Sequence, residues 1–279
     1  MTAASTHLAR GDYLLGAAEI ERARLGTQHD LWRPTVLSDW DRAGFAVGMH
    51  LLDVGAGPGH ATRDLLERVG PGGTVTAVER APESITELRA RFGSDARCRV
   101  INLDLTCDDI PLPPTGIGYD GAWCRWVAMF LSDVDGLVGR IARSLKPGGI
   151  AVFHEYLEYR TYRVMPEVPD VREFVEHAIA GLAQCGGDPN AATRVLAALD
   201  RHGLELVAQQ AHPVTARPNE VWWQWPAGFI RVFVPRQVEL GLATPEWAER
   251  TLAALARAEH SPESVIVGPL NMVLIARKR

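Results

Sequence analysis

The chain has 279 residues, of which 47% are apolar and 23% are charged, and its formal net charge is −5. These values argue against a disordered, fibrous or disulfide-stapled chain. The negative charge supplies no basic field that would attract nucleic acid or acidic membranes. The longest stretch without a charged residue, 264–276, is too short to span a bilayer.

Compartment and redox state can be inferred from the N-terminus and the cysteines. Residues 1–10 contain no basic-then-apolar signal segment. Cys98, Cys107, Cys124 and Cys185 show no CxxC spacing and no clustered histidine partners. We therefore expect a cytoplasmic chain with reduced thiols and no metal site.

Short apolar runs alternate with helical patterns over the first half of the chain. Each run is followed by turn or polar residues, and the spacing predicts strands that alternate with helices. Such alternation predicts right-handed crossovers and a mostly parallel sheet that is covered on both faces. The predicted strands are 50–54, 74–78, 99–103 and 149–154, and the predicted helices are 61–69, 82–92 and 133–145.

Beyond residue 156 the alternation becomes less regular. A helix over 191–202, a strand over 204–214 and a final apolar run over 265–275 are still indicated. The remaining segments are mostly helical by pattern and hold six of the eight tryptophans, so we expect them to cover one end of the sheet. The predicted organisation is an N-terminal helical cover (1–46), a core (47–156), a cover insertion (157–190), a core helix and strand (191–216), a helical cover insertion (217–263) and a last core strand (264–279).

The motif with the most chemical content is LLDVGAGPGH at residues 51–60. An apolar strand ends in an acidic residue, and a glycine-rich turn then opens a helix, which lets a ligand approach bare backbone. The glycine spacing is GxGxG, whereas a dinucleotide fingerprint requires GxGxxG and a phosphate loop requires GxxxxGK[ST]. His60 occupies the position where the dinucleotide pattern would need a small residue.

LDVGAGPG resembles the first motif of class I S-adenosylmethionine-dependent methyltransferases. Four further landmarks follow in the family's order: Glu79 after the second strand, Asp104-Leu105 after the third, YDGAWCR at 119–125 and LKPGG at 145–149. The resemblance implies an α/β, Rossmann-like three-layer sandwich with a mostly parallel seven-stranded sheet and a largely helical cover over the active site. It implies S-adenosylmethionine as the cofactor and S-adenosylhomocysteine as its product.

The resemblance also implies roles for individual residues. Glu79 would hold both ribose hydroxyls, and Asp104 would accept from the adenine amino group. Arg125 and N–H groups of the 55–59 turn would help to hold the methionine carboxylate. An N-terminal segment folds over the cofactor in related enzymes, which makes Tyr13, Arg24 and Gln28 candidates. The predicted cofactor-binding residues are Tyr13, Asp53, Gly55, Ala56, Gly57, Glu79, Arg80, Asp104, Leu105 and Arg125; for Asp53, a strand-end cap is an equal alternative.

Residues at the end of the fifth strand and in the aromatic-rich segment are candidates for the acceptor side. His154 has the intrinsic pKa of a general base, although a structural role is an alternative for a histidine at a strand end. The aromatic cluster at 222–233 suits either the core of a helical lid or contact with an aromatic acceptor. The predicted substrate residues are Trp126, Tyr156, Trp222, Trp223 and Phe229.

The expected function is methyl transfer to an enclosed small molecule such as a secondary metabolite, a quinone-like ring or another mid-sized apolar acceptor. The chain reads CRWV at 124–127, not the [DN]PP[YF] used on nucleobase amines, and no basic stripe is present. We therefore expect no nucleic-acid or membrane partner, and the sequence leaves open whether the chain forms a homodimer. Alternatives are a protein of this fold that binds the cofactor without transferring methyl, or an NAD(P)-dependent oxidoreductase, which the GxGxG spacing disfavours.

Overall fold

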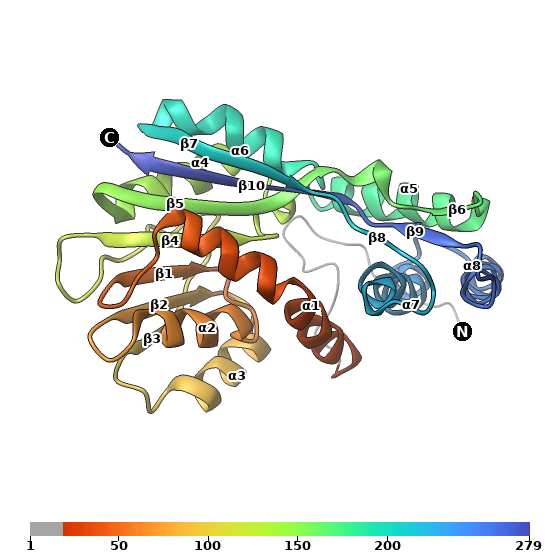
Figure 1. Cartoon of the computed structure of the whole chain (residues 1–279), viewed down its shortest axis with the longest axis horizontal. Helices are drawn as coiled ribbons and strands as arrows, with labels where there is room; N and C mark the ends of the chain where they lie inside the picture. Colours follow the sequence, from red (N-terminus) through yellow and green to blue (C-terminus); the bar gives the residue numbers. More distant parts are fainter. Residues whose placement is uncertain (1–18) are drawn as a thin grey trace. The chain divides into compact units, whose positions relative to one another are not determined.

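The computed structural model describes residues 19–279, which divide into two compact units (Figure 1). We name them the sheet unit and the helical unit. Neither is continuous in sequence, because the chain passes several times from one unit to the other. The sheet unit contains Trp32–Glu155, Ala191–Gln210 and Met272–Arg279, and the helical unit contains 19–31, Tyr156–Asn190 and Ala211–Asn271.

The sheet unit is built on a seven-stranded sheet with the strand order β3-β2-β1-β4-β5-β10-β7. The strands from β3 to β5 pair in parallel, whereas the arrowheads of β4 and β10 point in opposite directions in Figure 1. The predicted mostly parallel α/β sheet is thereby confirmed. Its strands are β1 (His50–Val54), β2 (Thr74–Glu79), β3 (Cys98–Asn102), β4 (Tyr119–Arg125), β5 (Leu145–Glu158), β7 (Leu204–His212) and β10 (Leu270–Lys278).

Helices cover both faces of this sheet. Successive residues of a strand point to opposite faces, and the four residues 51–54 of β1 are all buried. Both faces must therefore be packed, as the near-continuous apolar runs of the sequence predict. The helices that lie in the sheet unit or end there are α1 (Glu19–Ala43), α2 (His60–Val69), α3 (Pro82–Phe92), α4 (Val134–Ser144) and α6 (Ala191–Leu199), with short 3₁₀ turns η1 (Ala128–Phe130) and η3 (Asp200–His202).

Helix ends follow local signals in the sequence. Helix α2 begins after Gly59, whose φ is +86°, and ends at Gly70, whose N–H donates to the carbonyl of Leu66. At the start of α4, the side chain of Asp133 accepts from the N–H of Gly136. These caps fix both ends of α2, the helix after β1, and the start of α4, the helix before β5.

The strand order reverses beside β1. The chain passes from β1 outward to β2 and β3, and it then returns to the other side of β1 to form β4 and β5. Residues at the carboxyl ends of β1, β2 and β4 therefore lie at one edge of the sheet, at a topological switch point. In open α/β sheets this is where ligands bind.

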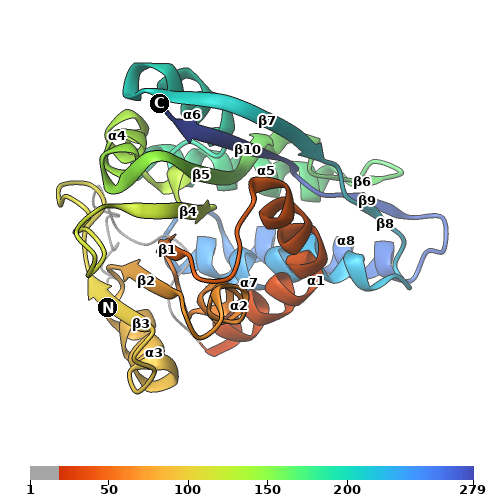
Figure 2. The same cartoon turned by 60° about the vertical axis from the view of Figure 1, so that its left-hand side comes forward.

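The helical unit combines three long helices with a small antiparallel sheet of order β6-β9-β8 (Figure 2). Among residues 19–279, no helix is both long enough and apolar enough to cross a membrane. The elements of the helical unit are α5 (Pro169–Gln184), α7 (Gln224–Glu239), α8 (Pro245–Glu259), β6 (Arg163–Met165), β8 (Thr215–Ala216), β9 (Val265–Val267), η2 (Tyr159–Thr161) and η4 (Val221–Trp223).

A continuous series of ring contacts, which we name the ring ladder, runs through the helical unit. Phe174 of α5 is fully buried at its centre and contacts Phe229 at 5.8 Å and Phe233 at 6.2 Å between ring centroids. Edge-to-face ring pairs prefer a defined geometry, and they stabilise the fold by more than the buried area alone would. The members of the ring ladder are Tyr156, Tyr159, Tyr162, Phe174, Phe229 and Phe233.

Three features differ from the sequence-based expectation. Residues 145–149, expected as the turn into the fifth strand, already belong to β5, which extends to Glu158. The apolar run 265–275 forms two strands, β9 and β10, because Gly268 and Pro269 interrupt it. A Cβ at Gly268 would lie 2.5 Å from the ring of Trp225, so the backbone must pass close to this indole. Trp32 and Trp40, which we expected in the cover, belong to the sheet unit, where Trp40 packs edge-on against Trp123 at 5.4 Å.

Candidate functional site

The glycine turn, residues 55–59, connects the carboxyl end of β1 to the start of α2. Gly55, Gly57 and Gly59 have φ values of +66°, +54° and +86°, which side-chain-bearing residues rarely adopt. Gly57 also faces open space, because a Cβ placed there would meet no protein atom within 4 Å. The turn therefore presents bare backbone at the switch point, where a ligand can approach closely.

N–H groups of the glycine turn are engaged inside the protein. Those of Gly55 and Ala56 donate to the carbonyl of Val78 at 2.9 and 3.0 Å, and that of Gly59 donates to Ala56 at 3.0 Å. Their predicted help with the methionine carboxylate stays a prediction. The positive end of the α2 dipole supplies a second attraction for an anion at the same place.

Glu79, at the end of β2, fastens the glycine turn to the next helix. Its Oε2 accepts from the N–H of Gly57 at 2.8 Å, and its Oε1 accepts from the N–H groups of Arg80 and Ala81 at 2.7 and 2.9 Å. A carboxylate offers about four lone-pair sites, so these three bonds leave capacity for a ligand hydroxyl. The half-buried carboxylate thus lies beside the open space at Gly57 and still can accept.

Asp104 and Leu105 follow β3, and Arg80 reaches towards them from the end of β2. Oδ1 of Asp104 accepts from the N–H and Oγ1 of Thr106 at 2.9 and 2.8 Å, and Oδ2 lies 3.7 Å from Nη1 of Arg80. Burial pushes the pKa of Asp104 upward, but the Thr106 hydrogen bonds and the positive charges of Arg80 and Arg140 outweigh it, so the pKa lies below its usual value. Asp104 is therefore an ionised acceptor at neutral pH.

Asp53 lies beneath the glycine turn and is only 2% exposed. Its Oδ2 accepts from Oγ1 of Thr62 in α2 at 2.6 Å, which ties the end of β1 to the helix after the turn. Burial raises the pKa of Asp53 to about 6, against the opposing effects of Thr62 and Arg125. This geometry supports the capping alternative, and direct contact with a cofactor stays a prediction.

An indole cluster of Trp32, Trp123 and Trp126 surrounds His154, which lies within β5 and not at its end as expected. The His154 ring lies 5.0 Å from Trp32, 5.4 Å from Trp126 and 6.0 Å from Trp123, and it is fully buried. The guanidinium of Arg125 lies over the Trp126 ring at 4.9 Å and near Trp123 at 5.9 Å. The predicted base role of His154 stays a prediction, and it would require a proton path past these rings.

The other predicted substrate residues lie in the helical unit. Tyr156 and Phe229 are members of the ring ladder, and the guanidinium of Arg24 lies 5.4 Å from the Phe229 ring. Trp223 is fully buried, and its Nε1 donates to Oε1 of Glu259 at 2.8 Å. Trp222 packs edge-on against Trp225 at 6.4 Å.

Arg24 and Gln28, the two candidates on α1, form a polar group with Glu21. Nε and Nη2 of Arg24 each donate to Glu21 at 2.7 Å, and Nη1 donates to Oε1 of Gln28 at 2.9 Å. The same amide oxygen accepts from Nε1 of Trp225 at 3.1 Å. The charge of Arg24 is thus balanced by a neighbouring carboxylate. Tyr13, the remaining candidate, lies outside the described residues.

Comparison with known families finds a match within the sheet unit. Residues 52–153 match the family described as "Methyltransferase domain". Over this range the chain is similar to methyltransferase domains, and we use the name methyltransferase domain for these residues. The matched range contains the glycine turn, Glu79, Asp104 and Arg125, so the resemblance seen in the sequence is confirmed.

Relatives and solved structures of this methyltransferase domain agree. The chain is 31% identical over 108 residues to malonyl-[acyl-carrier protein] O-methyltransferase of Acetivibrio thermocellus, which covers 39% of this chain and 36% of that protein. It is 30% identical over 158 residues to demethylmenaquinone methyltransferase of Tropheryma whipplei, which covers 54% of this chain and 61% of that protein. The match thus spans less than two thirds of either relative. Geranyl diphosphate C-methyltransferase of Streptomyces coelicolor shares the fold, with a TM-score of 0.55 at 14% identity over 98% of this chain and 90% of that one.

The residues of the methyltransferase domain fit S-adenosylmethionine, the methyl donor of this family. The cofactor carries hydroxyl and amino donors, and two carboxylates at neighbouring strand ends, Glu79 and Asp104, can accept from such donors in charge-assisted bonds. Gly57 leaves the space that a ligand needs beside Glu79. Arg125 places a cation at the end of β4, opposite in sign to the methionine carboxylate.

The sequence analysis missed three residues of the sheet unit that support the glycine turn. The hydroxyl of Thr62 donates a hydrogen bond to Asp53, and the side chain of Val127 packs against Gly55. Glu155 is fully buried in β5 and accepts from backbone N–H groups of the segment after β4. One signal was available: Glu155 directly follows the apolar run 149–154, and a charged side chain next to buried positions needs partners.

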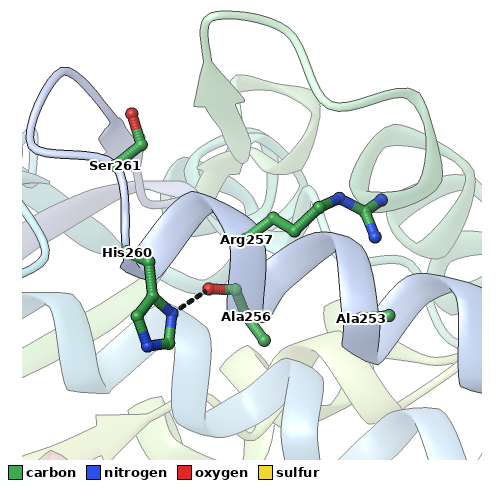
Figure 3. Close-up of a pocket in the computed structure, with 5 residues that line it drawn as sticks. All are labelled: Ala253, Ala256, Arg257, His260 and Ser261. Atoms are coloured by element: carbon green, nitrogen blue, oxygen red, sulfur yellow. Dashed lines mark hydrogen bonds between the residues drawn. The ribbon is translucent and has the colours of Figure 1, made fainter.

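A surface hollow of about 460 Å³ lies at the C-terminal end of α8 in the helical unit (Figure 3). In it, Nδ1 of His260 donates to the carbonyl of Ala256 at 2.7 Å. Its lining contains no carboxylate and none of the predicted site residues, so we assign the chemistry to the methyltransferase domain. The lining residues are Ala253, Ala256, Arg257, His260 and Ser261.

Proposed function

We propose that this chain transfers a methyl group from S-adenosylmethionine to a small apolar or aromatic acceptor. The observation that carries the proposal is the bond between Oε2 of Glu79 and the N–H of Gly57. It sets a carboxylate against bare backbone at the switch point, beside space for a ligand. A ribose diol placed there would lie beside the Glu79 carboxylate and the bare backbone of Gly57.

The chain's contribution to methyl transfer is binding, alignment and exclusion of water. S-adenosylmethionine supplies, when bound, an electrophilic methyl group on a sulfonium. Glu79 would accept from its ribose hydroxyls, Asp104 would accept from its adenine amino group, and Leu105 would pack beside the adenine ring. Arg80 lies 3.7 Å from Asp104, and Arg125 would attract the methionine carboxylate. Asp53 fixes the turn formed by Gly55, Ala56 and Gly57 from below, and Tyr13 is proposed to contact the cofactor from the N-terminal segment.

The acceptor is proposed to be an apolar or aromatic molecule, since the candidate contacts are aromatic. They are Trp126 in the sheet unit and Tyr156, Trp222, Trp223 and Phe229 in the helical unit. The quinone ring in the name of one relative, demethylmenaquinone methyltransferase, belongs to this chemical class. His154 is proposed as the base for acceptors that must lose a proton, and we propose a place in secondary metabolism.

The cysteines bear on the compartment in which the chain acts. We propose that it acts in the cytoplasm, because its four cysteines, Cys98, Cys107, Cys124 and Cys185, are free thiols. Burial raises the pKa of Cys124 well above its usual value, so this thiol beside the site is inert. The proposed partner is the acceptor alone, with no nucleic acid and no membrane, and a homodimer remains an option to test.

Glu79→Gln tests the proposal directly. The variant removes the charge and replaces one carboxylate oxygen with an N–H₂ group, which then faces either the N–H of Gly57 or the N–H groups of Arg80 and Ala81. We expect the affinity for S-adenosylhomocysteine, measured by calorimetry, to fall about tenfold to a hundredfold, since hydrogen bonds to a charged group contribute about 1.5–3 kcal/mol. Glu83→Gln is the matched control, because Glu83 lies exposed in the first turn of α3 and should leave the affinity unchanged.

Transfer itself is tested with a methyl-labelled donor and a panel of apolar ring acceptors. Labelled product from the wild type, and none from Glu79→Gln at the same donor concentration, supports the proposal. Binding of S-adenosylhomocysteine with no labelled product across the panel would favour the alternative of a cofactor-binding protein that does not transfer methyl. Quenching of tryptophan fluorescence by NADH, with no response to S-adenosylmethionine, would overturn the proposal in favour of an oxidoreductase.

A further inference from the structure

Glu155 is a buried carboxyl that the proposed function does not use. It lies in β5 with no exposed surface, and its Oε1 accepts from the N–H groups of Val127 and Ala128, both at 2.9 Å. Within residues 19–279, its Oε2 has no hydrogen-bond partner. Burying a carboxyl group costs free energy unless hydrogen bonds compensate for the lost contact with water. The two hydrogen bonds of Glu155 go to the backbone segment after β4.

That segment begins with an unusual backbone conformation. Trp126 is the only non-glycine residue of the described part of the chain with a positive φ, at +53°. Its N–H donates to the carbonyl of His154 at 2.9 Å, which extends the β4–β5 pairing by one residue. Non-glycine residues adopt this region only where the surroundings impose it. The two bonds to Glu155 come directly after Trp126, so they hold the chain where it turns away from the sheet.

Val127 carries this constraint to the glycine turn. A Cβ built on Gly55 would lie 2.4 Å from Cγ2 and 3.3 Å from Cγ1 of Val127. The valine side chain therefore packs directly on the first glycine of the turn, and no larger residue fits between them. A continuous path of contacts runs from the Glu155 carboxyl through the Val127 amide and side chain to Gly55.

We propose that Glu155 is a positioning residue of the methyl-transfer site, which fixes the Trp126–Ala128 backbone and thereby holds Val127 against the glycine turn. This inference rests on the proposed function, because it assigns Glu155 to the geometry of the S-adenosylmethionine site. The same bonds set the indole of Trp126, which stands beside Arg125 and His154. Loss of the carboxyl should then loosen one wall of the cofactor site without removing any group that touches the cofactor.

Three variants separate positioning from simple loss of stability. Glu155→Ala removes the acceptor, whereas Glu155→Gln keeps one oxygen for the two N–H groups and places its amide nitrogen where Oε2 has no partner. Val127→Ala leaves Glu155 intact and removes the contact with Gly55. Glu158→Ala is the matched control: this glutamate lies three residues further along the same strand, and its side chain caps η2 by accepting from the N–H of Arg160.

Calorimetry with S-adenosylhomocysteine gives the first readout. We expect Glu155→Ala to bind about tenfold more weakly, Glu155→Gln to stay within about twofold of wild type, and Val127→Ala to weaken binding in the same direction as Glu155→Ala. In kinetics with an acceptor that the wild type methylates, the KM for the methyl donor should rise in the same variants. The Glu158→Ala control should match wild type. A folded Glu155→Ala variant with unchanged affinity overturns the inference.

Hydrogen exchange gives a readout that needs no cofactor. The amides of Val127, Ala128 and Gly57 should exchange faster in Glu155→Ala than in wild type, and Glu155→Gln should restore their protection. Unchanged exchange at Val127 and Ala128 overturns the inference. If Glu155→Ala does not fold, Val127→Ala decides, because unchanged affinity in that variant overturns the inference as well. Failure of the wild type to bind S-adenosylhomocysteine would instead overturn the proposed function, and the exchange measurements would still test the path from Glu155 to the turn.

Discussion

The sheet unit and the helical unit position their candidate functional residues by different means. In the sheet unit, backbone does most of the positioning: glycines with positive φ shape the turn, and N–H groups of Gly57, Arg80 and Ala81 hold the Glu79 carboxylate. In the helical unit, side chains hold side chains, as in the ring ladder around Phe174. A site fixed by backbone depends on strand ends and glycines, whereas a site fixed by rings depends on packing.

The two units also contain buried carboxyl groups with different kinds of partner. Glu21 of the helical unit is 1% exposed and pairs with both Nε and Nη2 of Arg24. In the sheet unit, Asp53 accepts from a hydroxyl and Glu155 accepts from backbone N–H groups, and burial raises the pKa of both carboxyls. Glu21 is therefore balanced within a pair, as is Asp64 of the sheet unit, which lies 2.7 Å from Nε of Arg33. Asp53 and Glu155 instead accept from neutral donors, and their protonation is linked to folding.

The largest effect that tests this comparison is expected from Phe174→Ala. The side chain is fully buried and contacts Tyr162, Phe229 and Phe233, so its removal should lower the free energy of unfolding by about 4 kcal/mol. Phe174→Leu should cost less, about 1 kcal/mol, because it conserves more volume. Urea unfolding measures both. If the comparison holds, S-adenosylhomocysteine affinity stays within about twofold of wild type in the folded variants; a loss as large as that of Glu79→Gln would show that the ring ladder shapes the cofactor site.

Strand positions in the first half of the chain were accessible from the sequence, because apolar runs of five or six residues bounded by glycine and polar residues have few other solutions. The prediction of β1 at 50–54 and of α3 at 82–92 is confirmed to the residue. Gly268-Pro269 was a visible signal for the split of 265–275 into β9 and β10. What was not accessible is that the two strands join different sheets, because their strand partners lie far away in the chain.

The predicted cofactor-binding residues also include some that the sequence placed and some that it did not. Glu79 and Asp104 could be placed at one edge from strand order alone, since the carboxyl ends of parallel strands meet there. The support from Thr62, Val127 and Glu155 could not, because it consists of contacts made by side chains of other elements with the turn. Whether His154 faces an acceptor or lies within rings also depends on Trp32, which is distant in sequence and comes from α1.

An intermediate effect is expected from His154→Phe, which keeps a ring in the indole cluster and removes both nitrogens. If His154 is the base, kcat should fall about a hundredfold while affinity for S-adenosylhomocysteine is retained. Steady-state kinetics across pH, with calorimetry, measures both quantities. His202→Asn is a suitable control, because that histidine lies in η3 and pairs with Asp135 at 2.9 Å. An unchanged kcat would rule out the base role and leave His154 as a packing residue.

The smallest effect concerns pH and tests the contrast in buried charge. Burial raises the pKa of Glu155 to about 8, against the opposing N–H groups of Ala128, Val127 and Met129. Above the ordinary pKa of 4.5 the folded chain therefore binds more protons than the unfolded chain, so the stability that this group contributes is lost as pH rises towards 8. Between pH 6.5 and 7.5 the wild type should lose about 1 kcal/mol more free energy of unfolding than Glu155→Gln does. Asp53, with a pKa of about 6, titrates mostly below this window. Urea unfolding at the two pH values measures the difference, and Glu158→Gln should keep the wild-type slope. Equal slopes for the wild type and Glu155→Gln would mean that Glu155 keeps one protonation state in both folded and unfolded chains, and the contrast between charged and neutral partners would then rest on Asp53 alone.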